Sequence, residues 1–440
     1  NKFQNHIKFI IGKDTRPSSI ILEKFALNIV KHFDFDVIDV GICPTPIVLH
    51  AKHKLGIDGG IIISGSYNPP DWNAIKLLSE PSFVCFNELE EIKRIYETTP
   101  IPSFKKNFNY KIKSHNAIKS YKKDMKRFID FRYIKKANNL KVILDTGAGA
   151  GKFATPKILK KLGCKLKVIN NNLNKKGEFP RNIEPIEDNL HDLITTVWKE
   201  KTDLGFAHDS DADRLTIVGD DYKCYSEDVS LAIILHYYLQ KYQEEGKEIK
   251  FITNVASSLM FEKLAEDYNA KIIRTPIGEC YVLEKMDKLL HKKEDSKEII
   301  IGGEASCGGV IFPEFNYARD GIFAAAKIIE ILIKTNKKIS ELIEQLPSYE
   351  TYRITLDTKD RDIEKIITLL KEELISEGEK VSQIGFDLRF GKEGEWFVLI
   401  HPSTTEPTLR IISEARRKSL AKIYCESTYE LIKFVESKIE

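Results

Sequence analysis

Short apolar runs alternate with polar loops and amphipathic segments through most of the chain. The first run, His6–Ile11, is followed by a polar loop and then by a segment from about Ile20 to His32 with apolar residues at helical spacing. A uniformly apolar run of this length predicts a buried strand, and spacings of three and four residues predict a helix. The order of strand, polar loop and helix repeats, which predicts a mostly parallel sheet wrapped by helices.

This rhythm occurs in three successive segments and changes in a fourth. Strands are predicted at Lys141–Leu144 and Asp203–Ala207 in the second segment and at Phe251–Asn254 in the third. From roughly Leu346 the order becomes strand, helix, three strands and helix, which is typical of a small α+β domain with an antiparallel sheet. The first three segments are therefore predicted to repeat one α/β unit. The first boundary falls inside a basic connector from about Lys105 to Lys141.

The composition limits the classes of function. A chain of 440 residues exceeds what one core supports, and its net charge of +3 is the balance of 68 basic and 65 acidic residues. This balance argues against a nucleic-acid partner, and the basic connector favours a solvated helix, because Tyr121, Met125 and Phe128 recur in it at helical spacing. The seven scattered cysteines include no Cys-x-x-Cys pair, and no apolar run reaches the roughly 18 residues that span a bilayer. We expect free thiols, a cytoplasmic protein and no membrane partner.

Two strand ends carry turns that are candidates for chemistry. The apolar run Ile61–Ile63 stops at Ser-Gly-Ser and Asn-Pro-Pro, which presents the hydroxyl of Ser66 in an exposed loop; an ordinary turn is the alternative interpretation. The second turn, Asp145–Gly151, is rich in glycine and could cradle a phosphate on backbone amides. Its glycines do not follow the dinucleotide-binding pattern, which favours a structural tight turn.

Three aspartates, Asp209, Asp211 and Asp213, give the strongest local signal. Alternate residues of an extended or turning segment point to the same side, so the three carboxylates converge. Hard oxygen donors of this kind predict a Mg²⁺ site, and Arg214 beside them is placed to take a phosphate oxygen. The alternatives are a solvated acidic turn, which the flanking strands disfavour, and a calcium loop, whose glycine and distal glutamate are missing.

Two further loops suggest a phosphorylated sugar as the ligand. Ser403, Thr404 and Thr405 face Arg410 from the following strand, an arrangement that suits a tetrahedral dianion; a polar hairpin turn is the alternative. Glu304 and Ser306 lie in a glycine-rich loop, where a carboxylate is able to accept hydrogen bonds from vicinal hydroxyls. A hydroxyl nucleophile, a metal site, a polyol clamp and a phosphate cradle are the parts that phosphoryl transfer on a phosphosugar needs.

These motifs, taken in order, resemble the α-D-phosphohexomutase superfamily, which includes phosphomannomutase/phosphoglucomutase and phosphoglucosamine mutase. The matching stretches are Gly12–Arg16, Pro44–Pro46, Ser66–Lys76, Asp145–Gly151, Arg181–Pro185, Asp209–Arg214, Gly278 with Tyr281 and Val282, Gly303–Ser306 and Ser403–Arg410. The resemblance implies an α/β fold with three related α/β/α domains with mixed sheets and a smaller C-terminal α+β domain with an antiparallel sheet. We expect these domains at residues 1–117, 118–221, 222–345 and 346–440.

The resemblance also implies a reaction and a role for each candidate residue. Ser66 would carry the phosphate and complete the Mg²⁺ shell, and a hexose 1-phosphate and a hexose 6-phosphate would interconvert through a hexose 1,6-bisphosphate, which also serves as activator. Lys76 and Arg16 would lie near the transferred group, with Lys76 a candidate for proton handling. The sugar 3- and 4-hydroxyls would bind Glu304 and Ser306. The phosphate that is not transferred would bind Ser403, Thr404, Thr405 and Arg410.

Three positions and the N-terminal segment depart from the family pattern. Tyr67 stands where a histidine usually follows the serine, Cys307–Gly309 replaces the usual end of the sugar loop, and His401 stands where an arginine is common. The usual N-terminal segment is absent, so a shortened first domain is expected.

The sequence leaves the exact activity open. The leading hypothesis is a mannose or glucose phosphate mutase acting as a monomer or homodimer. Phosphoglucosamine mutase, a degenerate phosphosugar-binding protein and a Mg²⁺-dependent phosphatase are the alternatives.

Overall fold

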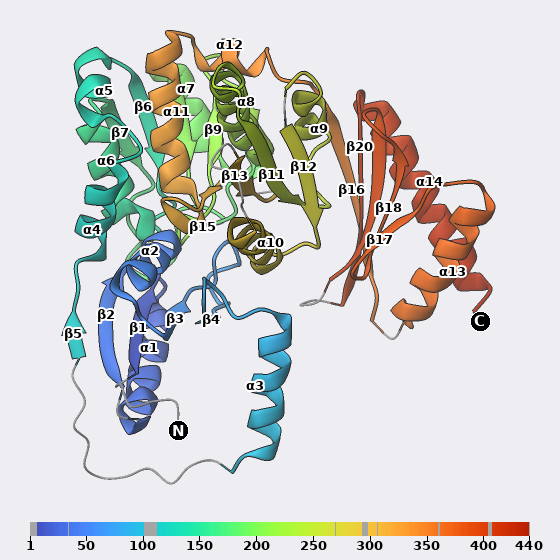
Figure 1. The fold of residues 1–440 in the computed structure, drawn as a ribbon, viewed down its shortest axis with the longest axis horizontal. Coiled ribbons are helices and arrows are strands. Elements are labelled where there is room, and N and C mark those ends of the chain that lie inside the picture. The colour runs from blue at the N-terminus through green and yellow to red at the C-terminus, as the bar shows by residue number, and fades with distance from the viewer. Residues whose placement is uncertain are drawn as a thin grey trace.

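The computed structural model describes residues 7–33, 35–100, 112–268, 270–292, 298–305, 307–359, 361–403 and 407–439. Figure 1 shows four units in these ranges, each built on a five-stranded sheet. The first three units pack side by side, and the fourth lies at the far right of the view. No helix in the described ranges has both the length and the apolar character that a membrane crossing requires.

The first unit has the strand order β4-β3-β1-β2-β5. Its strands are β1 (Lys8–Lys13), β2 (Asp36–Ile42), β3 (Gly59–Ile63), β4 (Ile75–Leu78) and β5 (Ile112–Ser114). Its helices are α1 (Pro17–Val30), η1 (Lys31–Phe33), α2 (Thr45–Leu55) and α3 (Phe86–Thr98). All neighbouring strands run parallel except β3 and β4. Ile10 and Ile62 are fully buried in the core, as their apolar runs predict.

The second unit has the order β10-β9-β8-β6-β7. Its strands are β6 (Lys141–Asp145), β7 (Lys165–Ile169), β8 (Leu204–Ala207), β9 (Thr216–Val218) and β10 (Cys224–Tyr225). Its helices are α4 (Ala117–Met125), α5 (Phe131–Ala137), η2 (Ala150–Phe153), α6 (Thr155–Lys161), η3 (Glu187–Asn189) and α7 (His191–Glu200). The helical interpretation of the basic connector is confirmed for α4, which buries Tyr121 and Met125 and leaves its lysines outside the core.

The third unit has the order β12-β11-β13-β14-β15. Its strands are β11 (Glu248–Asn254), β12 (Ala270–Thr275), β13 (Glu298–Gly303), β14 (Val310–Phe312) and β15 (Asn316–Asp320). Its helices are α8 (Glu227–Glu244), α9 (Met260–Ala265), α10 (Glu279–His291), α11 (Gly321–Thr335) and α12 (Ile339–Ile343).

The three sheets share one connectivity. In each, the first strand pairs in parallel with the second on one side and the third on the other, and an antiparallel strand follows the third. The prediction of three related α/β/α units with mixed sheets is confirmed.

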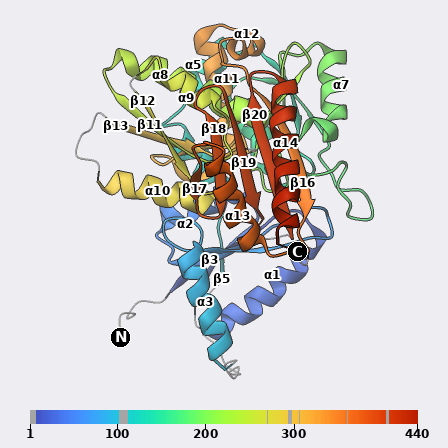
Figure 2. The same cartoon turned by 90° about the vertical axis from the view of Figure 1, so that its right-hand side faces the viewer.

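The fourth unit has a wholly antiparallel sheet, as predicted, in the order β16-β20-β19-β18-β17. Its elements are β16 (Glu350–Asp357), α13 (Ile363–Ser376), β17 (Ser382–Ile384), β18 (Asp387–Lys392), β19 (Trp396–Pro402), β20 (Thr408–Ala415) and α14 (Lys418–Ser437). Figure 2 shows α13 and α14 covering one face of this sheet. Phe397 and Leu399 on the other face pack against Val255 and Leu259 of the third unit.

Four strands follow α13, where the sequence predicted three. The extra strand, β17, has only three residues, and its serine and glutamine are exposed. It therefore lacks the apolar alternation from which a strand is predicted.

Candidate active site

Three candidate loops follow equivalent strands of the three related sheets. Ser66 follows β3, the aspartate cluster follows β8, and Glu304 follows β13. Each of these strands is the third of its unit, so the repeated topology brings the same strand end of every unit into the site. Ligands of open α/β sheets bind at such carboxyl ends.

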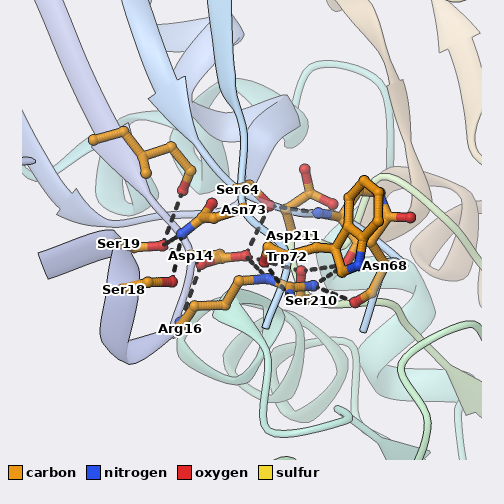
Figure 3. Close-up of polar contacts among 12 residues, drawn as sticks. Asp14, Arg16, Ser18, Ser19, Ser64, Asn68, Trp72, Asn73, Ser210 and Asp211 are labelled. Carbon is orange, nitrogen blue, oxygen red and sulfur yellow. Dashed lines mark hydrogen bonds and ion pairs between the residues drawn. The ribbon is translucent and has the colours of Figure 1, made fainter. Parts of the chain in front are cut away.

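The loop after β3 is held in place from below by Arg16. The buried Arg16 guanidinium donates all five of its N–H groups: Nε to Asp14, Nη1 to the carbonyls of Pro69 and Trp72, and Nη2 to those of Ser66 and Asn68, at 2.5–3.0 Å. Figure 3 shows this arginine under the loop. Its donors are therefore committed to the loop backbone.

Two backbone features of the same loop depend on this packing. A Cβ on Gly65 would lie 2.7 Å from the guanidinium carbon of Arg16, so only glycine fits there. Ser66 itself adopts a left-handed conformation with φ of 46°, which side chains disfavour. Its amide donates to Ser64 Oγ at 3.0 Å. The loop thus holds the Ser66 hydroxyl in one direction.

Asp14 joins the serine loop to the aspartate loop. Its buried carboxylate accepts hydrogen bonds from Ser19 Oγ at 2.7 Å, Ser64 Oγ at 2.8 Å and Ser210 Oγ at 3.0 Å (Figure 3). Ser210 Oγ also contacts the carbonyl of Ser66 at 2.7 Å. Through these contacts the first unit positions the second unit's loop, although Asp14 and Ser210 lie far apart in sequence.

The three aspartates converge as the sequence predicted. One oxygen from each of Asp209, Asp211 and Asp213 lies within 4.8 Å of the others, and all three side chains are buried. Ser66 Oγ donates to Asp209 Oδ2 at 2.8 Å, and Lys76 Nζ donates to Asp211 Oδ2 at 2.7 Å. The structure therefore brings Ser66, Lys76 and the aspartates into one cluster.

The electrostatics of this cluster call for a cation. Burial raises the pKa of Asp209 well above its usual value, and the neighbouring Asp213 and Asp211 raise it further. Burial alone would lower the pKa of Lys76, but Asp211 and Asp213 raise it, so Lys76 stays charged. Asp211 Oδ1 and Asp213 Oδ1 are buried without a hydrogen-bond partner. Orphaned carboxylate oxygens among hard oxygen donors fit Mg²⁺.

The backbone around the aspartate loop is closely packed. The His208 ring donates from Nδ1 to the Arg214 carbonyl at 2.7 Å, because a carbonyl oxygen can only accept, and burial lowers the pKa of His208 to about 4. A Cβ on Gly309 would lie 2.0 Å from the Asp213 carbonyl, so the third unit's backbone touches this loop.

The glycine-rich turn after β6 also belongs to this packing. The amides of Gly147, Ala148, Gly149 and Ala150 all donate to acceptors within the chain. This supports the tight-turn interpretation over the phosphate cradle.

Arg319 is a charged residue that the sequence did not single out. Its guanidinium forms ion pairs with Asp213 at 2.7 Å, Glu304 at 2.8 Å and Glu279 at 3.1 Å. Asp213 belongs to the aspartate cluster and Glu304 to the candidate sugar loop. Arg319 thus bridges two loops of the site from the end of β15.

Arg214 lies beside the serine loop and under Tyr67. The Arg214 guanidinium carbon lies 3.9 Å from the centre of the Tyr67 ring, and Nη1 lies 3.3 Å from Glu184 Oε1. Its Nε is buried without a hydrogen-bond partner. Tyr67, at the position where a histidine was expected, therefore packs a flat aromatic face against a cation.

The candidate sugar loop presents a buried and fully engaged Glu304. Its Oε1 accepts from the Gly278 amide at 2.9 Å and from Asn254 Nδ2 at 3.1 Å, and Oε2 accepts from Arg319. Burial raises the pKa of the neighbouring Cys307 thiol to about 12. Ser306 lies outside the described residues.

The candidate phosphate loop joins β19 to β20. Ser403 directly follows β19, Arg410 lies near the start of β20, and the Ser403 amide donates to the Thr408 carbonyl at 2.8 Å. His401 contacts Asp387 Oδ1 through Nδ1 at 2.6 Å. Thr404 and Thr405 lie outside the described residues.

The residues that sequence reasoning missed share one property. Asp14, Arg319 and Thr45, whose hydroxyl donates to Asp211 at 2.5 Å, all find their partners in distant segments. Asp14 and Thr45 lie inside stretches that resemble the family's motifs. The resemblance indicated that these stretches belong to the site, but it did not indicate which residues Asp14 and Thr45 contact.

Family models match three consecutive parts of the chain. The models of domains I, II and III of phosphoglucomutase/phosphomannomutase, each described as an alpha/beta/alpha domain, match residues 1–100, 119–222 and 226–349. These ranges contain every strand of the three related sheets except the edge strands β5 and β10.

Similar proteins cover nearly the whole chain. A phosphoglucomutase/phosphomannomutase of Thermococcus kodakarensis is 34% identical over 430 residues, which are 96% of this chain and 89% of the relative. A probable phosphoglucosamine mutase of the same organism is 31% identical over 97% of this chain and 90% of the relative. The solved structure of a phosphoglucomutase/phosphomannomutase family protein from Burkholderia thailandensis has a TM-score of 0.81 and 22% identity, over 98% of this chain and 90% of that one. This last likeness shows the fold.

Proposed function

The chain belongs to the phosphoglucomutase/phosphomannomutase family of the α-D-phosphohexomutase superfamily, and on that premise we propose that it interconverts hexose 1-phosphates and hexose 6-phosphates of mannose or glucose. The observation that carries the proposal is the hydrogen bond of 2.8 Å between Ser66 Oγ and Asp209 in the aspartate cluster. A nucleophilic hydroxyl beside a metal site is the arrangement that a phosphoserine intermediate requires.

Each transfer exchanges one P–O bond for another. The free hydroxyl of the sugar phosphate attacks the phosphate on Ser66, the bond to Ser66 Oγ breaks, and a hexose 1,6-bisphosphate forms. After the bisphosphate turns round, Ser66 accepts its other phosphate. Asp209, Asp211 and Asp213 would hold Mg²⁺ together with the Ser66 phosphate, and the bound ion would supply positive charge to offset the charge that develops on the transferred group.

The chain's own groups orient this chemistry. Arg16 holds the serine loop, and Lys76, which stays charged, supplies a positive charge beside the transferred phosphate and is the candidate donor of a proton to the departing Ser66 oxygen. Arg319 holds Asp213 and Glu304 together through ion pairs of 2.7 and 2.8 Å. The substrate is held by Arg214, Glu304, Ser306, Ser403, Thr404, Thr405 and Arg410.

A second candidate is phosphoglucosamine mutase. Relatives with that name are 31% identical over nearly the whole chain, close to the 34% of the phosphoglucomutase/phosphomannomutase relative. Glu304 and Ser306 are proposed to read the 3- and 4-hydroxyls, which glucose and glucosamine share. Position 2 of the sugar therefore separates the two candidates.

One assay tests these functions together. The 1-phosphates of glucose, mannose and glucosamine are each supplied with Mg²⁺ and a trace of the matching 1,6-bisphosphate, and the 6-phosphate is measured. Fastest conversion of mannose or glucose 1-phosphate is expected, whereas fastest conversion of the glucosamine compound would select the second candidate. No isomerisation, although Ser66 is phosphorylated, would refute both. Release of inorganic phosphate in its place would indicate a phosphatase.

The nucleophile is tested separately. Ser66→Ala is expected to abolish the phosphoenzyme, detected as the mass of one phosphate on the intact chain, and to lower turnover by at least about 10⁴-fold. Ser18→Ala, which removes a nearby hydroxyl outside the aspartate cluster, is the matched control. Full activity of Ser66→Ala would show that another group carries the phosphate.

A further inference from the structure

A cavity of about 730 Å³ lies where the third and fourth units meet. The third unit lines it with Leu259, which precedes α9, with Glu262 in α9 and with Arg274 in β12. The fourth unit lines it with Arg389 in β18 and Phe397 in β19. β18 and β19 run from this region to the Asp387 and His401 end, which carries the candidate phosphate loop. The cavity therefore lies toward the opposite end of the fourth unit's sheet from that loop.

Arg389 is a largely buried cation in this cavity without a carboxylate partner. Its Nε and Nη2 atoms are buried and have no hydrogen-bond partner in the described ranges, and no ion pair within 4.0 Å joins it to a described carboxylate. Its guanidinium carbon lies 4.2 Å from the centre of the Phe397 ring. This contact supplies no hydrogen-bond acceptor in the plane of the guanidinium, so it does not pair the N–H groups. Burial lowers the pKa of Arg389 to about 9, and Arg274 lowers it further by charge repulsion.

No described carboxylate forms an ion pair with Arg389, although Glu262, Glu414 and Glu393 act on its charge from a longer distance. Arg274 binds Glu262 through two contacts of 2.7 and 2.8 Å, so this carboxylate is already paired. The remaining N–H groups of Arg274 donate to the carbonyls of Asn254, Ser257 and Ser258. A buried arginine that is left unpaired destabilises the folded chain until an anion pairs with it.

We propose that this cavity binds the oxyanion group of a small molecule, a phosphate or a carboxylate, through Arg389. A guanidinium presents parallel N–H groups that match either oxyanion, and such charged hydrogen bonds are stronger than those between neutral groups. Lys380, Lys392 and Glu393 lie at the exposed rim, and Lys392 is paired with Glu395 at 2.6 Å, so the rim adds little net charge and Arg389 is the anion-binding group. The site is separate from the candidate phosphate loop, and the proposal is independent of the proposed function.

The segment beside the cavity leads into the candidate active site. Arg274 holds the carbonyl of Asn254, and the side chain of Asn254 donates to Glu304. The amide of Leu259, at the other end of this segment, donates to Glu414 of the fourth unit at 2.7 Å. An anion on Arg389 would therefore lie beside the contact that joins the fourth unit to the segment leading to Glu304.

Tryptophan fluorescence tests this site directly. Of the three tryptophans, Trp396 lines the cavity, while Trp72 and Trp198 are exposed elsewhere. In the full chain with Trp72→Phe and Trp198→Phe, inorganic phosphate and citrate are titrated separately. We expect a saturable change in Trp396 emission with at least one of them, phosphate identifying a phosphate-bearing ligand and citrate a carboxylate-bearing one.

Two matched variants decide whether Arg389 is responsible. Arg389→Met is expected to weaken the apparent affinity at least about tenfold, because it removes the charged donors. Arg410→Met, which alters the candidate phosphate loop, is expected to leave the Trp396 titration unchanged. The proposal would be overturned if Arg389→Met and its parent gave equal titrations. It would also be overturned if neither anion gave a saturable change at concentrations up to about tens of millimolar, the range in which weak sites bind.

Thermal unfolding checks that the variant is folded and supplies a second readout. Without added anion, Arg389→Met is expected to unfold at the same temperature as the parent or higher, because the variant no longer buries an unpaired charge. The anion is expected to raise the midpoint of Arg410→Met but not that of the Arg389→Met, Arg410→Met double variant. If Arg389→Met does not fold, Arg389→Gln replaces it in both measurements. An equal rise in both proteins would overturn the proposal.

Discussion

Arg319 contacts three carboxylates that come from three different segments of the chain. Its ion pairs with Asp213 and Glu304 span 2.7 and 2.8 Å, and the side chain is only 16% exposed. A lysine keeps the positive charge but has a single nitrogen, so it cannot reach three acceptors in a plane. This residue therefore sets the distance between the aspartate loop and the candidate sugar loop.

Arg319→Lys is expected to lower kcat/KM for the preferred sugar phosphate by about 10²-fold or more, because the two loops lose their common anchor. Steady-state kinetics measure this change. Arg94→Lys, in an exposed pair with Glu91, is the matched control and should behave as the wild type. Wild-type kinetics for Arg319→Lys would show that Asp213 and Glu304 are positioned by other contacts.

The aspartate cluster gives a prediction that does not require turnover. Mg²⁺ is expected to raise the thermal midpoint of the wild-type chain saturably. At a hundredfold excess over its Kd, the ion is expected to add about 2.7 kcal/mol to the free energy of unfolding. Asp211→Asn removes one charged ligand and is expected to lose most of this response. Asp192→Asn, at an exposed position, should respond as the wild type. A midpoint that does not depend on Mg²⁺ would contradict the assigned site.

At the scale of the element, the loop after β3 depends on a single side chain beneath it. Arg16 bonds to four carbonyls of the loop, and Gly65 leaves room for the guanidinium. The pattern Ser-Gly-Ser followed by Asn-Pro-Pro predicted a turn, but the direction of the Ser66 hydroxyl comes from these contacts.

Arg16→Lys is expected to destabilise the chain by about 3 kcal/mol and to abolish phosphorylation of Ser66, because a lysine leaves several buried carbonyls unpaired. Thermal unfolding and intact-chain mass report the two effects. Arg132→Lys, which changes an exposed arginine, provides the comparison. A folded, fully phosphorylated Arg16→Lys chain would mean that the loop keeps its shape without the clamp.

At the scale of the whole molecule, buried acidic groups gather where the third and fourth units meet. Asp228 on α8 lies near Glu414 on β20 and Glu227 on α8, with Arg353 as a partly compensating charge. Burial raises the pKa of Asp228 to about 7, and Glu414 and Glu227 add to the shift. The folded chain therefore holds this proton more tightly than the unfolded chain, whose aspartates titrate near about 4.

This shift predicts a pH dependence with a definite sign. Between about pH 4 and pH 7 the folded state binds more protons than the unfolded state, so stability contributed by neutral Asp228 is lost as the pH rises through this window. Asp228→Asn stays neutral and is expected to raise the thermal midpoint by a few degrees more at pH 8 than at pH 5. Asp188→Asn, at an exposed position, is the control. An equal shift at both pH values would show that Asp228 is not buried as a neutral acid.

The amino-acid sequence by itself determined the elements and the strand ends. Apolar runs and helical spacings depend on local burial, so the α/β rhythm, the change near Leu346 and the loops that carry Ser66, Asp209 and Glu304 were predictable. The short strand β17 was not, because its few exposed residues carry no pattern. The convergence of the three aspartates was predictable for the same local reason, since alternate residues share a side.

Only the tertiary structure decided which distant residues meet. Asp14 with Ser210, Arg319 with Asp213 and the unpaired Arg389 beside the paired Arg274 depend on how the four units pack. Such contacts join residues tens to hundreds of positions apart, and no local spacing records them. The physical reason is that a periodic pattern specifies which face of an element is buried, whereas packing between units specifies what that face touches.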